Sequence, residues 1–363
     1  MRAAVLFEQG KPQRVEELDL ESPRRGEVLV RMAASGVCHS CLHAADGSWK
    51  GVPVPIVLGD EGAGVVEALG PDVTELAVGD HVILSWAPTC GRCHYCVIGR
   101  PNLCERRQPG RGVLPDGTTR MSLGGAPVYH YGHVATYASR TVVHESCAIR
   151  IDPAMPLDRA ALIGCSVMTG VGAVLNTAAV PAGASVAVFG VGGVGLAGLM
   201  AGKIAGCDPI IAVDRLPSRL ALARELGATH VLESRGAETL ENLRRITGGG
   251  AHFAQETSAV PEVFRLAVDG LRPLGTCVLV GSARAGTEVS FEMPVLQGGR
   301  TVRGVIQGDS RPREFIPLLV DLFIEGRFPL DRLVTEYRFA DINRAAGEAT
   351  SGATIKPVLR LPH

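Results

Sequence analysis

The stretch Ser185–Gly202, which reads SVAVFGVGGVGLAGLMAG, decides the fold of this chain. It begins with an apolar, β-rich run, passes through Gly190, Gly192 and Gly195 in the spacing G-x-G-x-x-G, and ends in an apolar segment that can form a helix. Glycines in this spacing let backbone N–H groups approach a pyrophosphate at the N-terminus of a helix. The stretch therefore predicts a dinucleotide-binding β–α–β unit.

A carboxylate at the end of the next expected strand indicates which dinucleotide binds. Asp214 follows the apolar run Ile210–Val213. A carboxylate there accepts hydrogen bonds from the adenosine ribose and repels the 2′-phosphate of NADP, so we expect NAD(H). Arg215 and Arg219 lie nearby in the sequence and weaken this preference. The cofactor contacts expected in this unit are Gly190, Gly192, Gly193, Val194, Gly195, Asp214 and Arg219.

The composition fits a two-domain protein of 363 residues without a basic block. The net charge is −1, which gives nucleic-acid binding little electrostatic support. Residues 182–202 carry no charge and could cross a membrane by length, but their glycines and strand–turn–helix pattern argue against a membrane span. The first residues lack the features of a signal peptide, so we expect a soluble, cytoplasmic protein. Its ten cysteines then indicate metal binding or catalysis before disulfides.

The pattern of apolar residues changes along the chain. Residues 136–152, like the N-terminal segment, read as strands, whereas strands and helices alternate over residues 185–280 as in a doubly wound parallel sheet. Residues 158–180 read as helical segments interrupted by glycines. Residues 105–135, with the turn Pro109-Gly110, read as a long loop. We therefore expect an α/β protein with one β-rich part and one doubly wound part.

Four thiols lie close together between residues 90 and 104, at Cys90, Cys93, Cys96 and Cys104. This density fits a tetrahedral zinc site with four thiolate ligands and no open position, which is a structural site. An iron–sulfur cluster is the alternative, because ferredoxins also use cysteines separated by two residues. A nucleic-acid-binding zinc ribbon is disfavoured by the lack of a basic surface.

Two further segments concentrate reactive side chains. Residues 36–43, GVCHSCLH, combine thiol, imidazole and hydroxyl groups, and residues 57–64, VLGDEGAG, place two adjacent carboxylates between glycines. Such groups are costly in a core unless they bind a ligand or react. Cys165 and Thr169 follow in the expected helical segment. These segments are the candidate catalytic residues of the β-rich part.

The cofactor loop, the cysteine quartet and the thiol–imidazole cluster together resemble those of the zinc-containing medium-chain alcohol dehydrogenases. The similarity covers essentially the whole chain, in the order thiol cluster, G-x-E-G-A-G, cysteine quartet, G-C-x-x-x-T-G and cofactor unit. The segments Asp116-Gly-Thr and Pro127-Val-Tyr-His are similar to those of the liver-type branch and of the nitrosodimethylaniline-linked or thiol-adduct formaldehyde branches.

The resemblance implies an α/β fold in which a GroES-like β-rich catalytic domain is interrupted by a Rossmann doubly wound domain. The catalytic domain would comprise residues 1–166 and 307–363, with a structural zinc lobe at about 88–106. Residues 167–306 would form the NAD-binding domain. The resemblance also implies a homodimer or homotetramer formed through the last strand of that domain, near Val289–Thr301.

The resemblance further implies hydride transfer between the nicotinamide and a small alcohol or carbonyl substrate. The catalytic zinc ligands would be Cys38, Asp60 and Cys165, and Glu61 would approach the metal transiently. Ser40 would hydrogen-bond the alcohol and His43 would end the proton relay. His39 and Lys356 would contact the pyrophosphate. Thr169 would contact the nicotinamide, and Trp86 would contact the substrate.

Two positions depart from the pattern of the family. Asp60 replaces the histidine ligand, and Cys41 replaces the aspartate that supports that histidine. The changes agree, because a carboxylate at position 41 would repel Asp60. Three outcomes stay open. Zinc binds through Cys38, Asp60 and Cys165 and is a weaker Lewis acid, or Cys41 joins as an added ligand and closes the site. In the third outcome no catalytic metal binds, and the hydride passes to an activated C=C or iminium substrate. A non-catalytic NAD-binding protein on the same scaffold is a further alternative.

Overall fold

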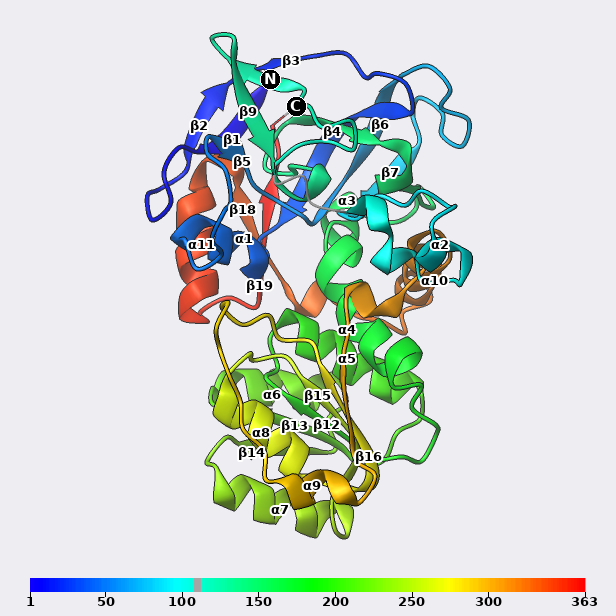
Figure 1. Cartoon of the computed structure of the whole chain (residues 1–363), viewed down its shortest axis with the longest axis vertical. Coiled ribbons are helices and arrows are strands. Elements are labelled where there is room, and N and C mark those ends of the chain that lie inside the picture. The colour runs from blue at the N-terminus through cyan, green and yellow to red at the C-terminus, as the bar shows by residue number, and fades with distance from the viewer. Residues whose placement is uncertain (108–111, 363) are drawn as a thin grey trace. The chain divides into compact units, whose positions relative to one another are not determined.

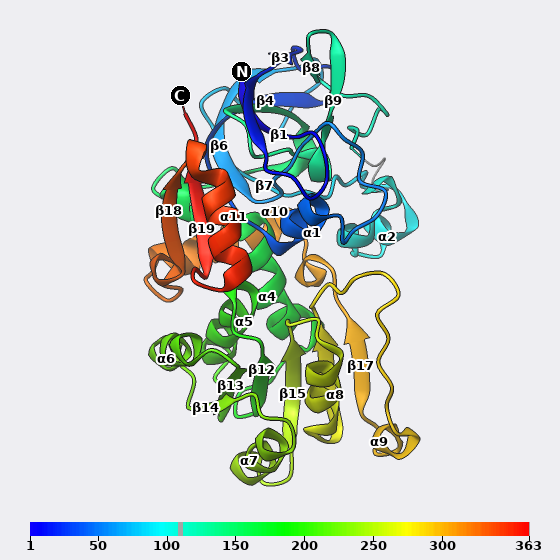
Figure 2. The ribbon, with the colours of Figure 1, turned by 90° about the vertical axis from the view of Figure 1, so that its left-hand side faces the viewer.

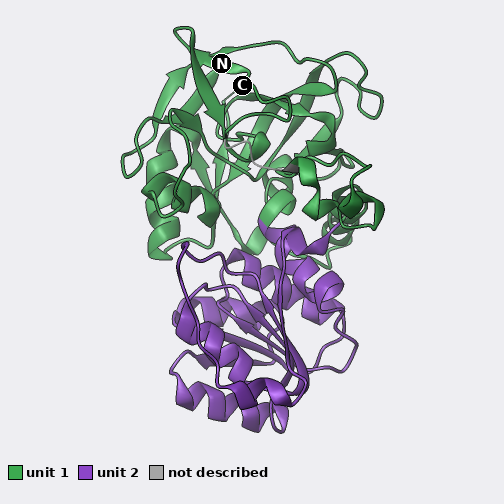
Figure 3. Cartoon of the chain, viewed as in Figure 1, with its two compact units in different colours: residues 1–165, 311–363 green, residues 166–310 purple. Residues whose placement is uncertain are grey.

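The structure, a computed structural model, describes residues 1–107 and 112–362 (Figure 1). The chain forms two compact units. Unit 1 comprises residues 1–165 and 311–363, and unit 2 comprises residues 166–310 (Figure 3). Unit 1 is β-rich and unit 2 is doubly wound, which confirms the fold class expected from the sequence.

Unit 1 contains two sheets of short strands. The first has the order β2-β1-β5-β9-β8-β3. Its strands are β1 (Arg2–Leu6), β2 (Arg14–Glu17), β3 (Asp19–Leu20), β5 (Ile56–Val57), β8 (Met121–Leu123) and β9 (Ala126–His130). The second has the order β11-β7-β6-β4-β19-β18, with β10 also paired to β4. Its strands are β4 (Glu27–Gly36), β6 (Gly62–Leu69), β7 (His81–Leu84), β10 (Arg140–His144), β11 (Ala148–Arg150), β18 (Val334–Arg338) and β19 (Lys356–Arg360).

Strand β4 lies at the centre of the second sheet, and its side chains alternate between buried and partly exposed positions. Val28, Val30 and Met32 point into the core, while intermediate positions between them are partly exposed. The C-terminal strand β19 pairs antiparallel with β4, with Leu359 opposite Ser35. The last residues of the chain therefore complete a sheet begun near its start, and Figure 2 shows β18 and β19 beside α11.

The helices of unit 1 are short and lie at the ends and faces of these sheets. They are α1 (His39–Asp46), α2 (His94–Val97), α3 (Leu157–Ala160), α10 (Pro312–Ile324) and α11 (Ile342–Ser351). Helix α1 packs Cys41 and Ala44 into the core formed by the two sheets. It ends at Gly47, whose left-handed backbone (φ 82°) terminates the helix.

Residues 112–135 correct the prediction of a long loop. They contain the β8–β9 hairpin, with a turn at Gly124 and Gly125, followed by a 3₁₀ turn at Tyr131–His133. The two strands are three and five residues long, and Gly and Pro lie in or beside them. They therefore show no clear periodicity in the sequence. The predicted turn at Pro109-Gly110 lies outside the described residues.

Unit 2 is a six-stranded parallel sheet in the order β14-β13-β12-β15-β16-β17. Its strands are β12 (Val186–Phe189), β13 (Ile210–Asp214), β14 (His230–Glu233), β15 (Ala251–Glu256), β16 (Leu271–Leu279) and β17 (Thr301–Gly304). Its helices are α4 (Met168–Gly172), α5 (Gly193–Ile204), α6 (Pro217–Leu226), α7 (Ala237–Thr247), α8 (Pro261–Asp269) and α9 (Met293–Gln297). The strand order reverses between β12 and β15, the point at which open parallel sheets bind ligands.

The helical segment that begins with α3 continues through its glycines instead of being interrupted by them. Two π-helical turns, Ile163–Val167 and Ala173–Thr177, flank α4. Gly164 permits close packing of the helix, because a Cβ at this position would lie 2.0 Å from the carbonyl oxygen of Leu84. The stretch Leu157–Thr177 is long and apolar enough to cross a membrane, but 78% of its most apolar window is buried, as in the core helix of a soluble protein.

Candidate functional site

Four side chains of unit 1 converge on one point. The ligand atoms of Cys38, Asp60, Glu61 and Cys165 all lie within 4.8 Å of one another. Cys38 precedes α1, the two carboxylates lie between β5 and β6, and Cys165 lies in the π-helical turn after α3. The turn before Asp60 requires Gly59, whose φ is +99° and whose added Cβ would lie 2.3 Å from Thr136 Oγ1.

Asp60 is held on both of its carboxylate oxygens. Its Oδ2 accepts a hydrogen bond from Ser40 Oγ at 2.5 Å and lies 3.9 Å from Cys165 Sγ. Its Oδ1 accepts a hydrogen bond from the Cys41 thiol at 3.5 Å. The two other sulfurs, Cys38 Sγ and Cys165 Sγ, are 4.0 Å apart. Asp60 Oδ2 therefore faces Cys165, whose sulfur lies beside that of Cys38, and Oδ1 faces Cys41.

The donor atoms of this cluster fit a metal cation. Asp60 and Glu61 are 4% and 0% exposed, and burial raises the pKa of both carboxyl groups. The neighbouring Cys38 thiol and burial raise the pKa of Cys165. Lys356 supplies one positive charge, with Nζ 2.7 Å from Glu61 Oε1. Two thiols and two carboxylates around one point are the donor types that zinc takes, and a divalent cation would offset their charge, so the residues fit the metal.

Cys41 is not among the residues whose ligand atoms converge in the described part of the chain. Its side chain is 1% exposed, and its sulfur lies 3.5 Å from Asp60 Oδ1. Burial, with a smaller contribution from the Asp60 charge, raises the pKa of the Cys41 thiol well above its usual value. The arrangement does not favour the outcome in which Cys41 joins the ligands and closes the site.

The residues expected to relay a proton and to line the substrate pocket lie on α1 and near Asp60. His39 is exposed, whereas His43 is half-buried with its ring 5.8 Å from that of Trp49. No hydrogen-bond partner for His43 Nδ1 is found among the described residues. Trp86 lies near the metal cluster, because an added Cβ on Gly132 would be 3.3 Å from Trp86 Cβ and 3.7 Å from Asp60 Cβ.

Two tyrosines beside Asp60 were missed by the sequence reasoning. Tyr131 interacts through its side chain with Ser40, and Tyr137 is 1% exposed with its phenol beside the Cys41 thiol. Burial raises the pKa of both phenols, so both remain hydroxyl groups. The sequence does contain a signal for them, because three of the chain's five tyrosines fall within residues 129–137.

Lys356, expected to assist at the pyrophosphate, is committed to Glu61 in this structure. Its side chain is 6% exposed and its Nζ also approaches the carbonyl oxygen of Val37 at 3.5 Å. Burial opposes protonation, but the Glu61 charge outweighs it and raises the pKa of the Lys356 ammonium. The pair forms because β19, which begins with Lys356, lies beside β4 and near the loop that contains Glu61. The predicted role toward the cofactor stays a prediction.

The cysteine quartet forms a second cluster in unit 1, with all four sulfurs within 4.8 Å of one another. Backbone N–H groups point at the sulfurs: that of Cys93 donates to Cys90 Sγ at 3.3 Å, and that of Cys90 to Cys104 Sγ at 3.4 Å. Hydrogen bonds from the backbone, that of Arg92 foremost, lower the pKa of Cys90 to about 6, which favours the thiolate. The geometry and chemistry fit a four-thiolate structural zinc.

In unit 2, the glycine loop between β12 and α5 is as tight as its sequence demands. Gly190 has φ +82°, and a Cβ on Gly195 would lie 1.9 Å from the Gly190 carbonyl oxygen. A Cβ on Gly192 would meet only Arg219 Nη1, at 3.9 Å, so the backbone is open at that point. Gly193 and Val194 begin α5, whose N-terminus favours a pyrophosphate.

Asp214 ends β13 and is fixed by backbone donors. Its Oδ2 accepts a hydrogen bond from the N–H of Val191 at 2.8 Å, and its Oδ1 from the N–H of Leu216 at 2.9 Å. Arg219 Nη1 lies 3.9 Å from Oδ2. The carboxylate and the glycine loop are therefore directly joined, as the ribose and pyrophosphate of one dinucleotide require. Thr169, expected at the nicotinamide, lies half-buried in α4.

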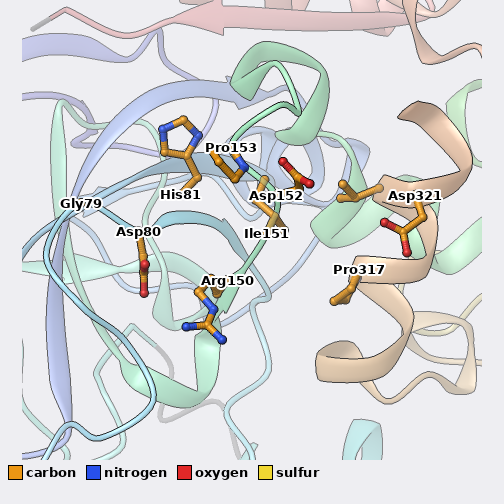
Figure 4. Close-up of a pocket in the computed structure, with 10 residues that line it drawn as sticks. Gly79, Asp80, His81, Arg150, Ile151, Asp152, Pro153, Pro317 and Asp321 are labelled. Carbon is orange, nitrogen blue, oxygen red and sulfur yellow. The ribbon is translucent and has the colours of Figure 1, made fainter. Parts of the chain in front are cut away.

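A surface pocket of about 420 Å³ in unit 1 shares no residue with either cysteine-containing cluster (Figure 4). Pro317 and Asp321 of α10 face Ile151 and Pro153 across it. Its remaining polar lining is made by Asp80, His81, Arg150 and Asp152. None of these residues was expected to be a site residue.

Comparisons with known proteins agree with these observations. The family model described as alcohol dehydrogenase GroES-like domain matches residues 24–153, and that described as zinc-binding dehydrogenase matches residues 193–325. The S-(hydroxymethyl)glutathione dehydrogenase of Paracoccus denitrificans is 37% identical, with 99% of each chain covered.

Two solved structures are similar over nearly the whole chain. An alcohol dehydrogenase zinc-binding domain protein from Burkholderia ambifaria has 44% identity and a TM-score of 0.96, covering 100% of this chain and 99% of its own. The benzyl alcohol dehydrogenase of Acinetobacter calcoaceticus has 38% identity and a TM-score of 0.95, with 99% of each chain covered. This chain belongs to the zinc-containing medium-chain alcohol dehydrogenases and is an NAD(H)-dependent oxidoreductase of alcohols and carbonyl compounds.

Proposed function

We propose that the catalytic zinc of this enzyme is bound by Cys38, Asp60 and Cys165, with Glu61 close to it. The observation that carries the proposal is the convergence of ligand atoms of Cys38, Asp60 and Cys165 within 4.8 Å of one another, with Asp60 Oδ2 3.9 Å from Cys165 Sγ. Carboxylate oxygen is an ordinary zinc ligand, so the replacement of histidine leaves a workable donor set.

Bound zinc withdraws electron density from a substrate oxygen, which makes an alcohol easier to deprotonate and a carbonyl easier to reduce. The Asp60 carboxylate adds a negative charge that a neutral imidazole would not bring. That charge opposes formation of an alkoxide at the metal. We therefore propose that a bound alcohol ionises less readily in this chain than in relatives with a histidine ligand.

Ser40 and His43 would handle the proton. The Ser40 hydroxyl donates its hydrogen to Asp60 Oδ2, so its oxygen keeps lone pairs with which to accept a hydrogen bond from a substrate hydroxyl. His43 lies three residues further along α1, on the same side of the helix, where it can end a relay. Tyr131, beside Ser40, adds a hydroxyl to the same hydrogen-bond network.

The cofactor would bind in the domain of residues 167–306, with its pyrophosphate at Gly192 and Gly193 and its adenosine ribose at Asp214. The open backbone at Gly192 and the fixed carboxylate of Asp214 support this placement. His39, Lys356, Thr169 and Arg219 remain proposed cofactor contacts. The cofactor supplies or accepts the hydride, and these residues only hold and orient it.

We propose a primary alcohol or aldehyde with an aromatic group as the substrate. The Cβ atoms of Trp86 and Asp60 both lie beside Gly132, and an indole at the site would favour a flat, apolar substituent. One relative is named a benzyl alcohol dehydrogenase, which supports this class. The relatives named S-(hydroxymethyl)glutathione dehydrogenase make the formaldehyde–thiol adduct the second substrate to test.

A cytoplasmic homodimer or homotetramer is the proposed assembly, joined along the β17 edge of unit 2. Strand β17 is the last of its sheet and leaves one edge without a strand partner in the described chain. Apolar side chains gather around it with unusual exposure: Leu274 (81%), Met293 (84%), Leu296 (43%) and Val302 (39%). An edge strand flanked by exposed apolar side chains is a surface that proteins usually cover.

Zinc stoichiometry measured together with turnover tests the proposal. We expect two zinc ions per chain, NADH oxidation with benzaldehyde, and loss of one zinc and of turnover in Asp60→Ala. One zinc per chain and no carbonyl turnover on a broad panel would contradict it. Turnover of a conjugated enone that survives chelation and Ser40→Ala would instead indicate a zinc-independent reductase, and NADH binding without any turnover would indicate a non-catalytic protein.

A further inference from the structure

Cys41 contacts the proposed zinc ligand Asp60 but does not reach the point where the ligand atoms converge. It lies at the third position of α1, one residue after Ser40. The two neighbours hold the two oxygens of Asp60 separately, Ser40 Oγ on Oδ2 at 2.5 Å and Cys41 Sγ on Oδ1 at 3.5 Å. One turn of α1 thus fixes both the position and the rotation of the carboxylate.

We propose that Cys41 is a positioning residue, which keeps Oδ1 of Asp60 turned away so that Oδ2 alone is presented to the zinc together with Cys38 and Cys165. This inference rests on the proposed zinc site and adds the residue that orients its unusual ligand. A carboxylate can bind a metal through one oxygen or both, and the torsion about its last bond is broad. A fixed hydrogen bond to Oδ1 removes that freedom.

The chemistry of a thiol suits this role. Cys41 has one hydrogen to donate, and Oδ1 is an acceptor only. A carboxylate at position 41 would place a second anion against Oδ1 with no hydrogen between them. An aliphatic side chain there would fill the same buried space but leave Oδ1 without a donor, which costs about 1–3 kcal/mol for a buried acceptor.

Tyr137 and Ser40 also lie beside the Cys41 thiol. Tyr137 is 1% exposed, and its side chain is a neighbour of the thiol. Ser40 Oγ lies 3.9 Å from Cys41 Sγ. The sulfur is therefore surrounded by two hydroxyl-bearing side chains and a carboxylate, and its own hydrogen is directed at the carboxylate.

The test compares metal binding in Cys41→Ala and Cys41→Ser with Cys147→Ala as the control. Cys147 is a fully buried thiol in the same core, away from Asp60, so its loss reports on packing alone. The readouts are zinc retained per chain, zinc affinity measured with a competing chelator, and the visible spectrum after cobalt(II) replaces the zinc. Melting temperature is recorded for each variant, because a thiol deletion can also loosen the fold.

We expect Cys41→Ala to keep the quartet zinc, to bind the second zinc about 10–100-fold more weakly, and to shift the cobalt spectrum. Cys41→Ser keeps a donor and should stay close to the unchanged protein. Tyr137→Phe, which removes one oxygen, should weaken the second zinc by less than Cys41→Ala, and it provides the test if Cys41→Ala does not fold.

Three results would overturn the inference. If Cys41→Ala and the unchanged protein have the same zinc affinity and the same cobalt spectrum, Cys41 contributes only packing. A loss in Cys41→Ser as large as in Cys41→Ala would show that volume matters and the hydrogen bond does not. If the unchanged protein holds one zinc, or if Asp60→Ala keeps two, the proposed zinc site itself is wrong and this inference falls with it.

Discussion

Lys356 Nζ lies 2.7 Å from Glu61 Oε1, and the two buried side chains form an ion pair between residues 295 positions apart in the sequence. Glu61 has no exposed surface, so its charge depends on this partner and on any cation at the neighbouring ligands. Buried pairs of this kind contribute little net stability when intact, but the loss of one partner leaves an uncompensated charge.

The first prediction follows from that ion pair. Lys356→Met should lower the free energy of unfolding by about 3–5 kcal/mol, because it leaves the Glu61 carboxylate buried without its partner. Urea unfolding measures the change. Lys50→Met, at an exposed position of the same unit, is the control and should have little effect. The double variant Lys356→Met with Glu61→Gln should recover much of the loss, and no recovery would show that Lys356 contributes packing alone.

A second prediction concerns acid stability and the buried Arg120. This guanidinium is 0% exposed and lies 2.9 Å from Glu27 through Nε and 2.6 Å from Asp116 through Nη2. Burial opposes ionisation of Asp116, but hydrogen bonds from Arg120 and Thr118 outweigh it and lower the pKa of its carboxyl to about 2.

Because the folded pKa of Asp116 is below the unfolded value, the carboxylate stabilises the fold above about pH 4, and this contribution is lost as the pH falls toward 2. Asp116 is 39% exposed, so we expect only about 1 kcal/mol after screening. Denaturant unfolding over a series of pH values from 7 to 2 measures it. Asp116→Asn should lower stability at pH 7 and flatten the decline with acid; an unchanged slope would contradict the prediction.

The third prediction concerns ionisation of the bound alcohol. Asp60→His combined with Cys41→Asp removes the charge of the ligand and supplies a carboxylate that can support the new imidazole. We expect kcat/KM for alcohol oxidation to rise roughly tenfold, the lower end of what such supporting groups contribute. Asp60→His alone should give a smaller rise. If the double variant leaves kcat/KM for alcohol oxidation unchanged, the proposed metal ligation is wrong.

A fourth prediction concerns cofactor choice in unit 2. Asp214→Ser removes the carboxylate that repels a 2′-phosphate and leaves Arg219, 3.9 Å from it, free to attract one. The ratio of kcat/KM for NADPH over NADH should rise by at least about tenfold, equivalent to about 1.4 kcal/mol. Asp214→Ser with Arg219→Ala should lose most of the gain. Glu241→Ser, at an exposed site of α7, is the charge control.

The sequence was most informative where structure is local. The glycine spacing and the flanking apolar run fixed β12 and the loop after it, because strand, turn and helix N-terminus are set by neighbouring residues. The β8–β9 hairpin could not be read in the same way, since its short strands pair with β3 and β5, which lie far away in the chain. Gly164 looked like a helix breaker because the close approach of Leu84 is invisible in the sequence.

The candidate metal ligands were identifiable by resemblance, but their surroundings were not. The sequence showed that Asp60 and Cys41 both depart from the family pattern, and the structure adds that their side chains touch. Tyr137 and Lys356 reach this cluster only through the folding of distant strands. Such contacts depend on how β4, β6 and β19 are paired, which no local pattern specifies.

The antiparallel pairing of β19 with β4 also sets an order of events during synthesis. The residues of unit 2 leave the ribosome before β19 does, so the cofactor unit, which is continuous in the chain, can fold while unit 1 still lacks a central strand. Until the final residues emerge, Glu61 has no ammonium partner. The metal cluster therefore reaches its full charge balance only in the finished polypeptide, and a chain that stops short of Lys356 has a cofactor unit but an incomplete catalytic one.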